Sequence, residues 1–108
     1  MTADSWGVTF SRTPIVKIVD ISHHTITVIW SAPASNRPIT DYQFAVRKGY
    51  PNGLKLPIDL LPSPGHPPPY RHEIHSLTSN TFYYIQVRGV DVDGDASHWS
   101  TQKVCKTL

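Results

Sequence analysis

Several stretches of this chain alternate apolar and polar side chains, and this period of two constrains the fold more than any other feature. Successive residues of an extended strand point to opposite faces of a sheet, so such stretches predict strands with one buried face. The three clearest, 24–30, 41–48 and 81–90, would bury the following residues: Ile26, Val28, Trp30, Tyr42, Phe44, Val46, Tyr83, Ile85 and Val87. No stretch of convincing length has the helical period, so the sequence predicts an all-β fold.

The ten prolines among the 108 residues favour the same conclusion. Their share is nearly twice the usual one of about 5%, and proline is tolerated poorly in helices and central strands. Weaker strand patterns lie at 14–21, 54–60, 70–75 and 99–108, of which 54–60 would be a short edge strand interrupted by Pro57. About seven short strands in one chain predict a two-sheet antiparallel β-sandwich. We expect residues 1–12 to be a tail or linker and residues 13–108 to form the domain.

Short motifs follow one another in a recognisable order along the chain. They are Pro14 at the first strand, Trp30 before Ser-Ala-Pro, Pro-Ile-Thr-Asp-Tyr42 in the third strand, Leu77 six residues before Tyr83, and Thr107 near the end. In these motifs, over about residues 14–107, the chain resembles the fibronectin type III domain. The resemblance implies an immunoglobulin-like sandwich of seven strands with fibronectin type III topology. It also implies a structural core that contains Trp30, Tyr42, Leu77 and Tyr83, with the Tyr83 hydroxyl bonded to upstream backbone.

A second set of residues lies near the end of the chain. The stretch from Tyr84 to Arg88, followed by Ala96-Ser-His-Trp99-Ser100, resembles the cytokine-receptor variant of this domain. In that variant an arginine of the sixth strand stacks on the tryptophans of a Trp-Ser-x-Trp-Ser box. Here Ala96 stands where the first tryptophan would be, so receptor-type ligand binding does not carry over. The resemblance still implies a cation–π pair of Arg88 with Trp99, with the guanidinium within about 6 Å of the ring centre.

Histidine and cysteine are present without a constellation that would support catalysis or metal binding. The single cysteine, Cys105, excludes an intramolecular disulfide and is expected to be a small core residue. Zinc needs several ligands that converge on one point. Histidines that are adjacent or three apart on a strand point to opposite faces, as these pairs would: His23 with His24, and His72 with His75.

Asp91, Asp93 and Asp95 crowd three carboxylates onto the loop between the last two strands. A weak calcium site is one interpretation, but the EF-hand loop has its glycine and glutamate at other positions. Asp-Gly is also the ordinary chemistry of a hairpin turn, which is the interpretation we favour. The sequence therefore predicts no catalytic residue, no metal site and no cofactor.

The composition limits the partners. Charged residues make up 17% of the chain, against about 25% in an average domain, and the formal net charge is +2. This balance argues against binding of nucleic acid through a basic face. No run approaches the ~20 apolar residues that span a bilayer, so we expect no direct membrane insertion. We expect a monomer in isolation.

These observations predict a non-catalytic protein-interaction or spacer module of a larger multidomain protein, with a cell-surface or secreted location favoured. An accessory domain of a secreted carbohydrate-active enzyme and an intracellular scaffold domain are the alternatives. The partner would be another protein or a neighbouring domain of the same chain. Neighbouring domains in the full-length protein would separate the three alternatives.

Partner contact is expected at the ends of the sandwich or on one sheet face. The candidates at the ends are Asn36 and Arg37 in one loop and Asp91, Asp93 and Asp95 in another, because variable loops cluster there. Phe82 and Tyr84 would point outward from the sixth strand. The proline-rich connection 49–69 carries several apolar residues, and we expect part of it to pack over these two rings.

Overall fold

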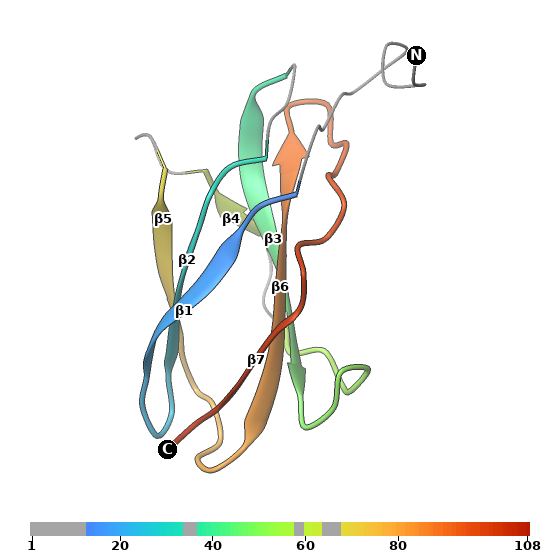
Figure 1. Ribbon diagram of the computed structural model, residues 1–108. Helices are drawn as coiled ribbons and strands as arrows, with labels where there is room; N and C mark the ends of the chain where they lie inside the picture. The colour runs from blue at the N-terminus through green and yellow to red at the C-terminus, as the bar shows by residue number, and fades with distance from the viewer. Residues whose placement is uncertain (1–12, 34–36, 58–59, 64–67) are drawn as a thin grey trace.

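The structure is a computed structural model that describes residues 13–33, 37–57, 60–63 and 68–108. Two antiparallel sheets pack face to face (Figure 1). The smaller sheet has the order β1–β2–β5 and the larger β4–β3–β6–β7. The strands are β1 (Val16–Ile21), β2 (Ile26–Trp30), β3 (Ile39–Lys48), β4 (Leu60–Pro62), β5 (Tyr70–Ile74), β6 (Phe82–Asp91) and β7 (Lys103–Lys106). This confirms the predicted seven-stranded, immunoglobulin-like sandwich.

The alternating apolar residues of both sheets meet in one core. Trp30 of β2 lies between the sheets, with its ring 5.5 Å from Tyr42 and 5.0 Å from Phe44 in edge-on arrangements. Tyr42 and Phe44 are fully buried. Burial, with Tyr70 beside it, raises the pKa of the Tyr42 phenol, so this group stays neutral. These aromatic residues therefore serve packing. Among the described residues no helix could cross a membrane.

Leu77 and Tyr83 fix the turn that leads into β6. Both side chains are buried, and the Tyr83 hydroxyl accepts a hydrogen bond of 2.7 Å from the backbone N–H of Thr78. Asn80 adopts a positive φ of 52°, a conformation that asparagine tolerates better than most residues. The tyrosine hydroxyl thus closes the bend at the position that the resemblance implies.

Replacing Tyr83 with phenylalanine should lower the free energy of unfolding by about 0.5–1.5 kcal/mol, because the Thr78 N–H loses its acceptor. Tyr84→Phe is the matched control, since the neighbouring Tyr84 points away from the core and is only half-buried. Chemical denaturation of both variants measures the two effects. Equal losses would mean that the Tyr83 hydroxyl does not stabilise the turn.

The described part of the connection 49–69 does not cover Phe82 as expected, since this side chain remains 47% exposed. Its backbone instead follows the open edge of β3, where the Leu56 N–H donates to the Val46 carbonyl at 2.8 Å and Lys55 bridges Arg47. The unpaired N–H and C=O groups of a strand edge can form hydrogen bonds with an extended segment. For the described part of the connection, these backbone hydrogen bonds take precedence over apolar packing on the sheet face.

Pairing along an edge also decides where the apolar side chains of the connection go. Leu56 and Leu61 pack against the core, whereas Tyr50 and Leu54 are 70% and 82% exposed. The expected edge strand at 54–60 is displaced, since β4 begins only at Leu60 and the earlier part makes one isolated bridge. Ile58 lies outside the described residues.

Candidate functional site

The larger sheet presents an outer face on which some large apolar side chains stay exposed. Period-two alternation turns one set of side chains away from the core, and two of its members are large, apolar and well exposed: Phe82 at 47% and Val104 at 52%. We call this set the outer face; it consists of Gln43, Ala45 and Arg47 of β3, Phe82, Tyr84, Gln86 and Arg88 of β6, and Val104 and Lys106 of β7.

Trp99 lies over one end of the outer face. The guanidinium carbon of Arg88 is 4.4 Å from the centre of its ring, inside the limit of about 6 Å for a cation–π contact. The Nε of Arg88 also donates to Gln43 Oε1 at 2.7 Å, which fixes the plane of the guanidinium. Lys55, from the connection, brings its ammonium to 5.5 Å from the same ring. Trp99 is therefore contacted by two cations.

The other end of the outer face repeats the pairing of a cation with an aromatic ring. Lys106 lies opposite Phe82 in the register of β6 and β7, and its ammonium is 5.4 Å from the Phe82 ring. Tyr84 stands between Arg47 and Val104 in the adjacent row. Arg47 donates to the Gly53 carbonyl at 3.1 Å, which holds the start of the connection against the sheet.

Sequence reasoning singled out Phe82, Tyr84, Arg88 and Trp99. It missed the two lysines that contact the rings, Lys55 on Trp99 and Lys106 on Phe82. The connection places Lys55 at the face, and no local pattern predicts that contact. Lys106 could have been found from the register, because a last strand that pairs residue by residue with β6 brings it opposite Phe82. That register was not fixed by the short β7 pattern alone.

Two buried serines hold the segment that carries Trp99. β7 pairs with β6 only as far as Ile85, so the backbone of β6 beyond that point needs other partners. Ser100 accepts from the Val87 N–H through its hydroxyl at 2.9 Å and donates its own N–H to the Val87 carbonyl. Ser97 does the same for Gly89 at 3.0 Å. The two serines thus act as a substitute strand and position Trp99 over the sheet.

Arg37 and the aspartate loop meet at one end of the sandwich. The Nη1 atom of Arg37 lies 2.7 Å from an oxygen of Asp93, 3.5 Å from Asp95 and 4.0 Å from Asp91. Asp91 is buried, and its other oxygen accepts from the backbone N–H groups of Asp93 and Asp95, so it shapes the hairpin and offers no surface to a partner. Asn36 lies outside the described residues.

The hairpin interpretation of this loop agrees with its geometry. The single guanidinium of Arg37 lies within 4.0 Å of all three carboxylates and offsets part of their negative charge. Within the described ranges, no group of three or more His, Cys, Asp or Glu side chains is arranged to hold a metal ion. Cys105 is half-buried against the core, and burial raises the pKa of its thiol, which disfavours the reactive thiolate.

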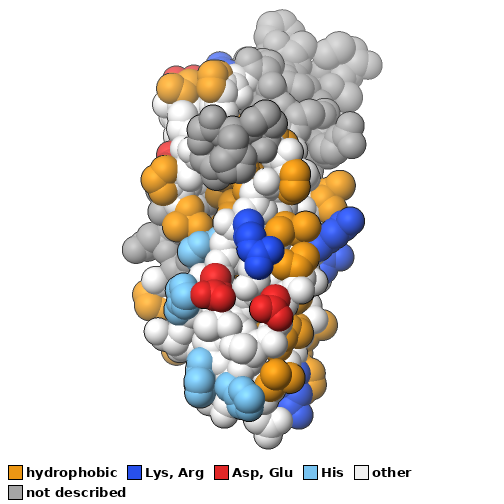
Figure 2. Space-filling model, turned by 90° about the vertical axis from the view of Figure 1, so that its left-hand side faces the viewer, with side chains coloured by type: hydrophobic (Ala, Val, Ile, Leu, Met, Phe, Trp, Pro, Cys, Tyr) orange, Lys and Arg blue, Asp and Glu red, His pale blue; other side chains and the backbone are white. Residues whose placement is uncertain are grey.

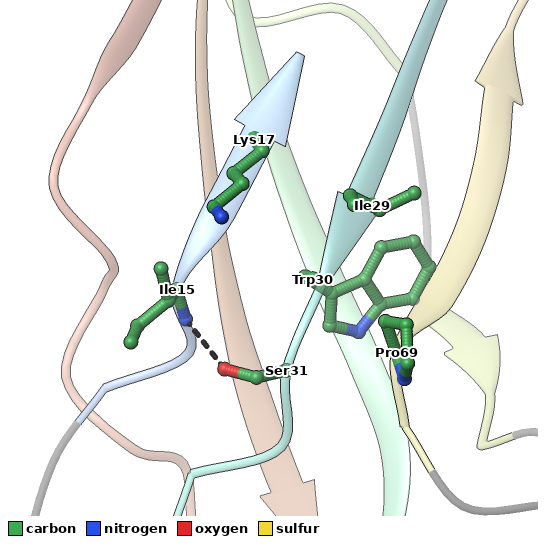
Figure 3. A pocket seen from close by; sticks show the side chains of 6 residues that line it. All are labelled: Ile15, Lys17, Ile29, Trp30, Ser31 and Pro69. Carbon is green, nitrogen blue, oxygen red and sulfur yellow. Dashed lines mark hydrogen bonds between the residues drawn. The ribbon is translucent and has the colours of Figure 1, made fainter. Parts of the chain in front are cut away.

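The smaller sheet has a different surface. Its outward positions mix both charges, with Lys17 and Arg71 in one row and Asp20 and Glu73 in the next (Figure 2). A shallow, mainly apolar pocket of about 310 Å³ opens beside this sheet (Figure 3). Its lining residues are Ile15, Lys17, Ile29, Trp30, Ser31 and Pro69. The two faces of the sandwich therefore differ in charge as well as in exposure of aromatic rings.

His72 of β5 points into the sandwich, and its ring lies 5.5 Å from Phe44. Burial, with a smaller contribution from His75, lowers its pKa below the ordinary value of 6.5. The unfolded chain thus binds a proton at His72 more readily than the folded protein does. The free energy of unfolding should therefore fall as pH decreases from about 6.5 towards the lowered pKa, and His72 should cause no change above pH 6.5. Urea denaturation across this range should show the decline in the parent and a smaller one in His72→Gln. Exposed His98, replaced by Gln, is the control, and an equal reduction there would contradict the assignment.

Comparison with known proteins places this geometry in a family. The family model of the fibronectin type III domain matches residues 13–105. Titin module A71 from human cardiac muscle is 22% identical, with 87% of this chain and 88% of that chain covered and a TM-score of 0.66. The FN5 domain of Drosophila Lar is 20% identical, with 92% and 97% covered and a TM-score of 0.65.

A longer protein contains a similar domain. The structure of astrotactin-2, a vertebrate-specific membrane protein, is 18% identical over 87% of this chain but only 21% of that chain, with a TM-score of 0.65. No curated protein matches the chain. Identities this low establish the fold alone, whereas the family model covers most of the sequence. With its core tryptophan, its tyrosine corner and this match, the chain belongs to the fibronectin type III family.

Proposed function

We propose that this domain is a protein-interaction module of a larger, cell-surface or secreted multidomain protein, and that it contacts its partner through the outer face. Fibronectin type III domains occur in multidomain proteins as interaction or spacer modules and are generally non-catalytic. The cell-surface place is proposed by analogy with astrotactin-2, a membrane protein that contains a domain of this fold.

The exposure of Phe82 and Val104 on one rigid sheet carries this proposal. Large apolar side chains that lie close together on a surface are typical of contact sites. The residues that could suggest chemistry are engaged in the fold: Asp91 shapes a hairpin, Tyr83 closes a turn, and Tyr42 packs in the core. On the outer face, by contrast, Phe82 and Val104 are exposed side by side with cations and can contact a partner.

Photo-cross-linking tests the proposal. A photoreactive phenylalanine analogue at position 82, in an extract of the native cells, should give an adduct of defined mass. The same analogue at Val19, which is 45% exposed on β1 of the opposite sheet, is the control and should give none. Adducts at neither position, or the same adducts at both, would contradict a defined contact on the outer face.

A further inference from the structure

Among the described residues, the outer face and the segments lying on it carry positive charge without matching negative charge. Four cations gather there: Arg47, Lys55, Arg88 and Lys106. Among the described outward positions of β3, β6 and β7 the only acidic residue is Asp41, which lies at the far end and accepts a hydrogen bond from Thr40. In the part of the chain that the structure describes, the ion pairs all lie elsewhere, at Arg37 and at His75 with Glu73.

Aromatic rings hold three of these cations in place. Arg88 and Lys55 lie over Trp99, and Lys106 lies over Phe82. A cation that rests on a ring loses less side-chain freedom when a carboxylate arrives, so less binding free energy is lost to ordering. The outward-facing Ala45 is only 2% exposed, so its neighbours are closely packed around it. The charges therefore form a largely preorganised surface.

We infer that the outer face binds an acidic protein segment that also carries apolar side chains, an inference that rests on the proposed interaction function. The unpaired cations attract carboxylates, and exposed Phe82 and Val104 provide apolar contacts between them. A sulfated polysaccharide would use the cations and leave both apolar side chains in water. The smaller sheet carries both positive and negative side chains, so it does not attract an acidic segment. The electrostatic attraction of such a segment is therefore directed to the outer face.

An NMR titration of the chain tests this inference with a short synthetic peptide that alternates glutamate and valine. We expect saturable shifts of the amides of residues 82–88 and 103–106 and of the Trp99 indole N–H. The same peptide with glutamine in place of glutamate should bind about tenfold more weakly or worse. Equal binding of the two peptides, or shifts that centre on the smaller sheet, would overturn the inference.

Charge reversal identifies the residues responsible. Lys55→Glu combined with Lys106→Glu should weaken binding of the glutamate peptide about tenfold or more. Lys17→Glu combined with Arg71→Glu on the opposite sheet changes the net charge equally, and this matched control should change binding by less than about twofold. Both lysines on the outer face are exposed, so folding should persist, and the amide spectrum verifies it. If the double variant on the smaller sheet weakens binding to the same extent, the effect comes from the net charge of the domain, and the inference about the outer face is rejected.

Phe82→Ser separates a protein segment from a polysaccharide. It should weaken binding of the glutamate peptide and leave any binding of heparin unchanged. If heparin binds while the peptide does not, the face recognises sulfated polysaccharide and the inference fails. If cross-linking from position 82 captures a partner and the glutamate peptide still does not bind, the interaction function stands and the acidic chemistry is rejected.

Discussion

Replacing Trp30 with alanine should lower the free energy of unfolding by about 3–5 kcal/mol, the usual cost of removing a large aromatic side chain from a core. Trp30 is 3% exposed and contacts Tyr42 and Phe44 edge-on across the space between the sheets. Neither ring can move in to fill the cavity without leaving its own sheet. Chemical denaturation monitored by circular dichroism measures the loss.

A loss of this size is a large part of the stability of a typical domain, which is about 5–15 kcal/mol. Trp30→Phe therefore provides a second measurement on a variant that retains an aromatic ring. Among the described residues no acceptor pairs with the Trp30 Nε1 donor, so Trp30→Phe removes packing contacts but no hydrogen bond. It should therefore lower the free energy of unfolding by less than Trp30→Ala does. If Trp30→Phe destabilised as much as Trp30→Ala, the ring contacts would not be the source of the stability.

The core could be predicted from sequence because the rule that governs it is local. Alternation along a strand decides which side chains share a face, and one buried face sets the register. Trp30, Tyr42 and Tyr83 lie buried where alternation and motif placed them. The contact between Arg88 and Trp99 follows the same logic, since Arg88 is on the outward parity of β6.

The connection 49–69 shows where local reasoning ends. Its apolar residues indicated that it packs somewhere, but the choice between the outer face and the edge of β3 depends on which backbone groups of another strand remain unpaired. That is a property of the assembled sheet. Lys55 reaches Trp99 as a consequence of edge pairing, so its place at the outer face could not be derived before the pairing was known.

Asp91 illustrates a different limit. A carboxylate in an Asp-Gly loop suggests a solvated surface, and on this ground the sequence makes Asp91 a contact candidate together with Asp93 and Asp95. Its inward parity at the end of β6 instead buries it, and two backbone N–H groups and Arg37 stabilise the charge there. The predicted strand ends at residue 90, whereas β6 continues to Asp91. As part of the strand, Asp91 follows the alternation and faces the protein, not water.

The double replacement Ser97→Ala and Ser100→Ala should lower the free energy of unfolding by about 2–6 kcal/mol. Each hydroxyl accepts from a buried backbone N–H, and an unsatisfied buried donor costs about 1–3 kcal/mol. Alanine preserves the backbone bonds of residues 97 and 100, so the loss isolates the hydroxyl groups. Urea denaturation of the single and double variants measures it, with exposed Thr101→Ala as the control.

Hydrogen exchange gives the same prediction at residue level. The Val87 and Gly89 amides should exchange about tenfold faster or more in the double variant, whereas the Ile85 amide, within the part of β6 that pairs with β7, should change little. Trp99→Ala discriminates between two origins of this protection. If the serine hydroxyls protect these amides, removing the indole leaves both slow. If the Val87 and Gly89 amides both exchange fast in Trp99→Ala, the stacked indole ring protects them by excluding water from β6. The serine hydroxyls would then not be the source of the protection.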